Sequence, residues 1–243
     1  MVFRAFSVLS IIMFGLCATE KLNLPVPTCK RNSSHYNSCL KRAINEAWPL
    51  FVKGLPAEFD LQPLDPYFYE YLKAVANNSN LYGEITTSNT TIEGLKMIRF
   101  IAVRSHFSDD AFRLKIDARI PKIYAEGIYD AFGTIAEFRF NGKGYFNVTI
   151  GDIGGSWDIL GSVKDDTLII KHFRITLTLK NLKLYIHNFD NPVIDELVMM
   201  FVNGNWPVLY RIVMPLAIDY WDTYFSNLLN RFFAKLSFSQ VFP

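Results

Sequence analysis

The residues of this chain that could do chemistry are few and widely spaced. The nearest approach to a serine nucleophile, Gly154-Gly155-Ser156-Trp157-Asp158, lacks the second glycine and the strand-to-helix setting of a hydrolase elbow. None of the four histidines stands three or four residues from another, the spacing that places two metal ligands on one helix face; they are His35, His106, His172 and His187. The sequence therefore predicts no catalytic residue, no metal site and a protein that is not an enzyme.

Two further motifs resemble functional sites but are better explained as turns. Gly142-Lys143-Gly144 lacks the third glycine of a dinucleotide fingerprint and is expected to join two strands. The carboxylate pairs Asp109-Asp110 and Asp165-Asp166 also fall in expected turns, where aspartates are ordinarily solvated. The formal net charge of +2 gives no electrostatic reason to expect nucleic acid. We therefore predict no cofactor and no nucleic-acid partner.

The N-terminus has the composition of a secretory signal peptide. Arg4 precedes the apolar run 6–16, and small residues lead to an expected cleavage after Ala18. Residues 19–243 then form one domain, since no linker or repeat divides them. The protein is expected to be secreted and extracellular.

Once the signal peptide is removed, Cys29 and Cys39 remain as one pair in an oxidising compartment. We expect them to form a disulfide, which would stabilise the fold by roughly 3 kcal/mol in the chain-entropy model. Four sequons agree with passage through the secretory pathway; they are Asn32, Asn77, Asn89 and Asn147.

Two helices are expected to flank the part of the chain that would position any site. A short amphipathic helix follows Cys39, is interrupted by Pro49 and ends at Gly54. A much longer one spans 205–236, begins near Pro207 and would measure about 48 Å at 1.5 Å per residue. Arg211 is the one charge between positions 206 and 218, so this half is expected to be buried on every side. Arg211, Pro215 and Asp219 leave no uninterrupted apolar run of the roughly 20 residues that a membrane span needs.

Between these helices, from about residue 81 to 189, the hydrophobic period is two. The stretch 112–120 alternates apolar and charged residues, as a half-buried strand does. Hairpins are expected at 141–144 and 164–166, and a parity slip at Lys180 and Asn181 indicates a bulge. A long curled antiparallel sheet with one apolar face needs a partner of matching length. The predicted class is α+β, with the long C-terminal helix wrapped by the sheet.

Several motifs, in order along the chain, resemble the insect Takeout and juvenile-hormone-binding protein (JHBP) family, and Takeout more closely. They are Cys29 and Cys39, Gly54-Leu55-Pro56, Leu64-Asp65-Pro66, Asn205-Trp206 and Val241-Phe242-Pro243. Two features depart from the family pattern. The chain has no cysteines for the second disulfide of hormone-binding members, and Ser237-Phe238-Ser239-Gln240 replaces the usual proline and acidic residues.

The resemblance implies a highly curved antiparallel sheet around a long helix, a TULIP-like elongated barrel with an apolar tunnel. It also implies a secreted carrier of a small hydrophobic ligand such as juvenile hormone, another terpenoid or a long-chain lipid. Some members have roles in feeding, circadian rhythm or chemosensation. The missing second disulfide weakens juvenile hormone as the particular ligand.

We expect the tunnel to be lined by one stripe of the long helix and by inward strand residues. The helical phase selects Tyr210, Met214, Ala217, Trp221, Phe225 and Leu228, and the facing strand residues are Phe112, Leu114, Ile116, Phe138 and Phe140. Close packing of these residues against each other remains open, because the tunnel follows from the resemblance and not from the periodicity. Two other functions also remain: a membrane-acting lipid-transfer protein without stable membrane insertion, and a secreted hydrolase of apolar esters.

Overall fold

The computed structural model describes residues 21–77, 81–108, 111–135, 137–189 and 192–243, so the expected signal peptide lies outside the described residues. Its α-helices are α1 (Tyr36–Lys53), α2 (Asp195–Phe233) and α3 (Phe238–Val241). Short 3-10 turns cover Ala57–Phe59, Leu95–Met97 and Pro192–Ile194. The strands are β1 (Tyr67–Asn77), β2 (Leu81–Glu93), β3 (Arg99–Phe107), β4 (Phe112–Ile135), β5 (Phe138–Lys164), β6 (Thr167–Thr178) and β7 (Asn181–Asn188).

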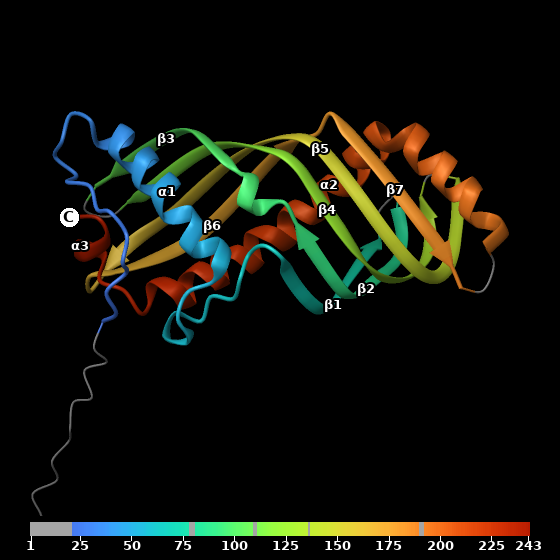
Figure 1. Cartoon of the computed structure of the whole chain (residues 1–243), viewed down its shortest axis with the longest axis horizontal. Helices are drawn as coiled ribbons and strands as arrows, with labels where there is room; N and C mark the ends of the chain where they lie inside the picture. Colours follow the sequence, from blue (N-terminus) through green and yellow to red (C-terminus); the bar gives the residue numbers. More distant parts are fainter. Residues whose placement is uncertain (1–20, 78–80, 109–110, 136, 190–191) are drawn as a thin grey trace, which may run out of the picture.

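All seven strands form one antiparallel sheet that curves around α2 without closing into a barrel (Figure 1). Its main order is β1-β2-β4-β5-β6, with β3 paired to the first half of β4 and β7 to the first half of β5. The sheet therefore has two halves. We call β3, β6 and the parts of β4 and β5 between them the four-stranded half, and β1, β2, β7 and the remainder of β4 and β5 the five-stranded half.

A line of irregularities crosses the sheet where the two halves meet. Pro121 lies in β4, Asp152 lies in β5 with φ of 50°, and β6 and β7 are separate strands on either side of Lys180. Strands β4 and β5 keep one register along their whole length. Buried residues of β4 are nevertheless even-numbered up to Ala118 and odd-numbered from Ala125. A proline and a left-handed residue reorient the backbone locally, so opposite parities face α2 in the two halves.

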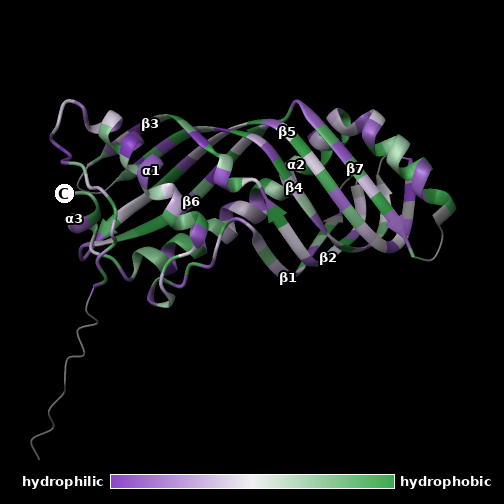
Figure 2. Cartoon of the chain, in the orientation of Figure 1, coloured by the Kyte–Doolittle hydropathy of each residue, from purple (hydrophilic) through white to green (hydrophobic). Residues whose placement is uncertain are grey.

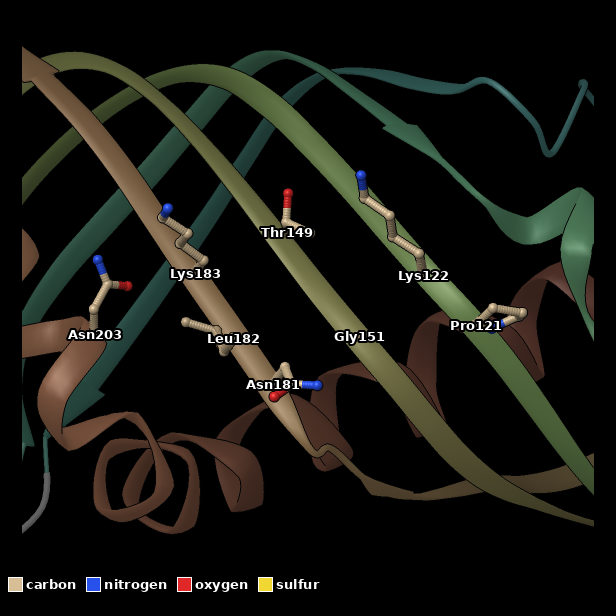
Figure 3. Close-up of a pocket in the computed structure, with 8 residues that line it drawn as sticks. All are labelled: Pro121, Lys122, Thr149, Gly151, Asn181, Leu182, Lys183 and Asn203. Carbon is tan, nitrogen blue, oxygen red and sulfur yellow. The ribbon is translucent and has the colours of Figure 1, made fainter.

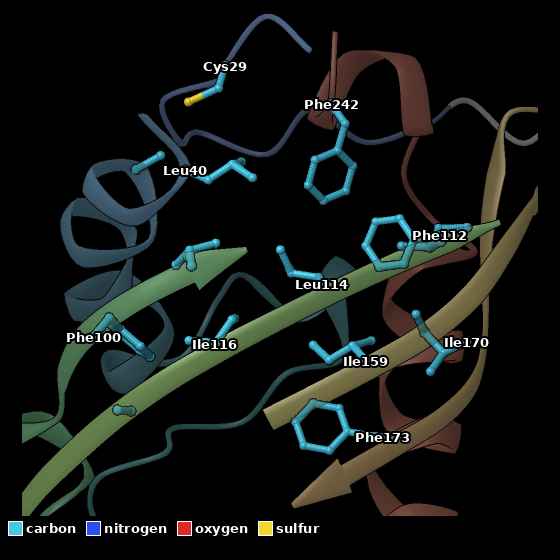
Figure 4. Packing of buried hydrophobic residues seen from close by; sticks show 14 of the residues in the cluster. Cys29, Leu40, Phe100, Phe112, Leu114, Ile116, Ile159, Ile170, Phe173 and Phe242 are labelled. Carbon is cyan, nitrogen blue, oxygen red and sulfur yellow. The ribbon is translucent and has the colours of Figure 1, made fainter. Parts of the chain in front are cut away.

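The main hydrophobic core lies over the four-stranded half. Helix α1, the C-terminal half of α2 and α3 all contribute to it, together with inward residues of β3 to β6. Figure 4 shows Leu40 of α1 and Phe242 near the C-terminus on the same side of β4 as Leu114. The disulfide between Cys29 and Cys39, with its sulfurs 2.00 Å apart, belongs to this cluster and confirms the predicted pairing.

The long helix differs from the prediction in its start and its burial. It begins at Asp195 instead of Asn205, and Pro207 lies inside it. Asp195 and Glu196 occupy the first turn, where the helix dipole favours acidic side chains. The prediction that the apolar half, 206–218, is buried all round is wrong, because Val208 and Val213 are 54% and 43% exposed. The sheet covers one side of this half and leaves the other open.

Two predicted breaks are absent. Pro49 does not end α1, which continues to Lys53 and stops at Gly54 as expected. The predicted hairpin at 141–144 is wrong as well, because β5 runs through it. Its glycines permit close packing instead of a turn: a Cβ on Gly144 would lie 2.0 Å from the carbonyl oxygen of His187 on β7.

Other strand predictions are confirmed in part. The β5–β6 hairpin turns at Asp165 and Asp166, and both have positive φ. The bulge predicted at Lys180 and Asn181 is wrong: the chain breaks there into the separate strands β6 and β7, and the register shift against β5 lies at Leu160 and Gly161 instead. Figure 2 shows the alternation of hydrophobic and hydrophilic residues along β4, β5 and β7. The sheet starts earlier than predicted, since β1 already begins at Tyr67.

Candidate ligand-binding region

The helix-facing surface of the five-stranded half is apolar but incompletely packed. By strand parity it carries branched and aromatic residues from three adjacent strands, and most of them are half-buried. Side chains of a filled core are normally buried almost completely. We call this surface the apolar floor and define it as Ile123, Tyr129, Phe146, Val148, Ile150, Leu182, Leu184 and Ile186.

The opposite half has the packing that the apolar floor lacks. Phe112, Leu114 and Ile116 are at most 7% exposed, and the Phe107 and Phe112 rings stack with centroids 4.9 Å apart. Helix α1, the C-terminal residues and α2 together fill this end. The two halves of one sheet thus differ in how much room they leave beneath α2.

Hydrogen bonds hold the first half of α2 along the β6–β7 edge of the sheet. The Asn203 amide accepts from the Leu184 N–H at 2.7 Å and donates to the Leu184 carbonyl at 2.9 Å. The Tyr210 hydroxyl donates to the Leu177 carbonyl at 2.6 Å. At the helix start, the buried Asp195 carboxylate accepts from the Asn188 N–H at 2.9 Å. These bonds set the position of the helix over the apolar floor.

A second contact joins α2 to the other edge of the sheet. The hydroxyls of Tyr67 on β1 and Tyr224 on α2 lie 2.5 Å apart. Burial is the larger cause and this hydrogen bond the smaller one that raise the pKa of Tyr67 above its usual range, so the hydroxyl stays protonated. Asp222, two residues before Tyr224, accepts from the Phe173 N–H on β6 at 2.6 Å. Helix α2 therefore spans the gap between the two sheet edges, and the region beneath it is roofed by the helix.

The structure divides the predicted site residues between the two halves. Phe112, Leu114 and Ile116 lie in the packed core. Phe138 and Phe140 lie at the far end of β5, and their side chains lie outside what the structure describes. Phe112 pairs with Gly161 whereas Phe138 pairs with Ile135, so the two groups occupy opposite ends of the sheet. They do not form one compact pocket.

The predicted helix stripe is also divided. Trp221 and Phe225 are partly buried against the main core, and the Phe225 ring lies 5.2 Å from that of Phe173. Tyr210, Met214, Ala217 and Leu228 are half-buried. Whether any of these residues contacts a ligand remains a prediction. Tyr210, Met214 and Ala217 are the members of the stripe on the half of α2 that covers the apolar floor.

The sequence prediction missed the apolar floor itself. Its residues alternate in the opposite parity from the strand recognised at 112–120, because the change occurs at Pro121 and Asp152. The signal was present, since a proline inside a strand pattern marks an irregularity. An alternation restarted at Ile123 would have selected Ala125 and Tyr129 as inward residues.

The residues considered for catalysis or metal binding do not converge. Ser156 lies within β5, paired with Thr176, and not at a strand-to-helix turn. His172 contacts Asp222 at 2.8 Å and His187 contacts Asp195 at 3.4 Å, and both histidines are exposed. Among the described residues, no group of three or more His, Cys, Asp and Glu side chains could hold a metal ion.

The fold is thus a curved antiparallel sheet around a long helix, with an incompletely packed apolar surface facing that helix. The family model described as "Haemolymph juvenile hormone binding protein (JHBP)" matches residues 8–243. The chain belongs to this family of hydrophobic-ligand-binding proteins.

Comparison with solved structures agrees with this assignment. The chain resembles Takeout 1 of Epiphyas postvittana with a TM-score of 0.70 and 19% identity, covering 88% of this chain and 97% of that one. A weaker likeness to a lipopolysaccharide binding protein has a TM-score of 0.30 and 10% identity over 77% of this chain and 38% of that one. A search among curated protein sequences gave no match.

Proposed function

We propose that this protein is a secreted, non-enzymatic carrier that holds one small lipophilic molecule between α2 and the apolar floor. The observation that carries the proposal is the half-buried state of apolar residues that face the helix, such as Val148 and Leu184. Water against such a surface is costly, at about 25 cal/mol per Å² of apolar area, so an apolar ligand that displaces it gains affinity. Family membership supports the same function.

The ligand class follows from the chemistry of the region. The apolar floor carries no charged residue, so it would select a ligand chiefly by shape and length. A terpenoid or another long-chain lipid fits this description, and juvenile hormone is one such molecule. Physiological roles in feeding, circadian rhythm or chemosensation are compatible with a secreted carrier. Native mass spectrometry of protein from its own source would identify a co-purified lipid.

Titration with a homologous series of long-chain alcohols tests the proposal. Each methylene moved from water into the protein should add roughly 0.8 kcal/mol, or about fourfold in affinity, until the available space is full. Affinity should then level off or fall. It should change little between about 0.05 and about 0.5 M salt, because screening acts on charges and not on apolar contact. A flat length profile with strong salt dependence would reject an apolar carrier.

One observation favours a second function, the transfer of a lipid to or from a membrane. The segment Asp195–Pro215 has the length and the apolar composition needed to cross a bilayer, and no residue of its most apolar stretch is buried. Val193, Leu197 and Met200 are all more than 60% exposed near the start of α2. Such a surface can insert shallowly among lipid headgroups.

Liposome flotation separates this function from that of a soluble carrier. A transfer protein should float with neutral vesicles, and Leu197→Glu with Met200→Glu should abolish flotation because buried carboxylates are costly in lipid. The pair Glu58→Gln and Glu46→Gln, which alters charge on and just after α1, serves as a control. No flotation of the wild-type protein would leave the soluble carrier as the supported function.

A further inference from the structure

A hollow over β4, β5 and β7, bordered at the β7 edge by Asn203 of α2, has the composition of an anion site. Its volume is about 650 Å³, and it lies on the line of irregularities between the two sheet halves. Figure 3 shows Lys122, Thr149 and Lys183 projecting to the same side of three neighbouring strands. The lining residues are Pro121, Lys122, Thr149, Gly151, Asn181, Leu182, Lys183 and Asn203.

The hollow exists because a glycine interrupts a row of side chains. Gly151 on β5 pairs with Lys122 on one side and with Asn181 on the other. A Cβ on Gly151 would lie 3.6 Å from the Asn181 Cβ, an ordinary contact, so close packing does not require the glycine. What Gly151 provides is open space between two polar side chains.

Four hydrogen-bond donor groups surround this space, and two of them are cationic. They are the Lys122 and Lys183 ammonium groups, the Thr149 hydroxyl and the Asn181 amide. No acidic residue is among the lining residues. Within the described part of the chain, neither lysine forms an ion pair with a carboxylate. Two cations without a carboxylate partner, one on each side of β5, favour an anion in the hollow between them.

The strand that supplies half of these donors is fixed in place. Asn203 of α2 bonds both the N–H and the carbonyl of Leu184, next to Lys183. The Asn203 side chain is therefore engaged in positioning β7 and does not act as a ligand. Because β7 is held, Asn181 and Lys183 face β5 in a defined register.

We propose that this hollow binds a phosphate group. Donors reach it from β4, β5 and β7, and a tetrahedral oxyanion presents acceptor corners in several directions whereas a carboxylate presents two in one plane. The bearer of the phosphate is either a soluble phosphorylated molecule or the headgroup of an anionic lipid. The donor residues have the strand parity opposite to that of the apolar floor, and Leu182 borders both regions.

An NMR titration with inorganic phosphate tests the proposal on the whole protein. Backbone signals of residues 149–151 and 181–183 should shift in a saturable way, and raising salt should weaken binding. Lys122→Gln with Lys183→Gln should reduce affinity by at least about tenfold. Lys41→Gln with Lys164→Gln removes the same charge at exposed positions elsewhere and should have little effect. Equal losses in both double variants, or shifts that never saturate, would overturn the proposal.

Two further variants separate the hollow from net charge. Gly151→Leu keeps every lysine but occupies the space, so it should also abolish saturable binding. Thr149 is the third residue of the Asn147 sequon, so Thr149→Ser is the variant that preserves both the hydroxyl and the sequon, and it should bind as the wild type does. Unchanged phosphate binding in Gly151→Leu would show that the hollow is not the site.

Vesicles identify the source of the phosphate. If wild-type protein sediments with phosphatidic acid vesicles but not with phosphatidylcholine vesicles, and the Lys122→Gln, Lys183→Gln variant does not, the ligand is a lipid headgroup. If inorganic phosphate binds at these residues without vesicle binding, the ligand is a soluble phosphorylated molecule. Vesicle binding that is unchanged in the variant, together with no phosphate binding, contradicts the proposal.

Discussion

Replacing one leucine in each half of the sheet separates packed core from ligand surface. Leu114→Ala removes a side chain that is 7% exposed within the main core, whereas Leu184→Ala removes a half-buried one from the apolar floor. Both substitutions delete the same atoms. The difference between their effects therefore reports on the surroundings.

The magnitudes follow from burial. Deleting a fully buried leucine leaves a cavity and costs about 2 to 5 kcal/mol. At roughly 2 to 4 °C per kcal/mol for a chain of this size, a cost of about 3 kcal/mol lowers Tm by about 6 to 12 °C. Leu184→Ala exposes less new surface and leaves no closed cavity, so a loss of about 1 kcal/mol is expected.

Ligand binding should show the opposite order. Leu184→Ala should weaken the best-bound alcohol about fivefold, the equivalent of about 1 kcal/mol, while Leu114→Ala should leave the affinity of the folded protein unchanged. Calorimetry and displacement of a fluorescent lipid measure the two effects on the same samples. If Leu184→Ala destabilises as much as Leu114→Ala and does not alter affinity, the apolar floor is ordinary core.

Three further predictions concern the stability of the fold. Cys29→Ser with Cys39→Ser should lower the free energy of unfolding by roughly 3 kcal/mol in chemical denaturation and loosen α1, and an unchanged midpoint would show that the bridge is dispensable. The hydrogen bond from Arg113 holds the pKa of the Asp158 carboxyl below its usual value. The stability from this pair should therefore be present above about pH 4 and be lost as pH falls through the lowered pKa. Asp158→Asn should flatten that part of a stability–pH curve, and a curve identical to that of the wild type would contradict the assignment. Gly144→Val should destabilise the protein more than Gly151→Val does. A Cβ at Gly144 would lie 2.0 Å from the His187 carbonyl oxygen, whereas a Cβ at Gly151 would have its nearest contact at 3.6 Å. Thermal melts that rank the two variants in the reverse order would be evidence against this strand packing.

The sequence predicts this fold well wherever one local pattern decides the structure. The alternation at 112–120, the turn at Asp165-Asp166 and the stop at Gly54 each depend on neighbouring residues, and all three are present. The predicted break at Pro49 and hairpin at Gly142-Lys143-Gly144 failed for the opposite reason. Tertiary contacts override both signals: α1 packs against the core on either side of Pro49, and β7 approaches the glycines.

The candidate site was harder to predict because it depends on a change of facing in the middle of two long strands. A single alternation carried through β4 would place Lys122 and Tyr124 beneath the helix, whereas Pro121 and Asp152 turn Ile123 and Ala125 there instead. The exposure of Val208 could not be read from hydrophobicity either. An apolar helix is buried only if enough sheet surrounds it, and that depends on the curvature and open edges of the whole sheet.

Photolabelling of the wild-type protein tests the location of the ligand most directly. A long-chain alcohol with a diazirine in mid-chain is bound, irradiated and located by peptide mass spectrometry. The account predicts labels on the apolar floor, within 123–150 and 182–186, and on the covering half of α2, within 198–217. Labels confined to α1, to 112–118 and to 238–242 would place the ligand in the packed half and contradict the carrier site proposed here.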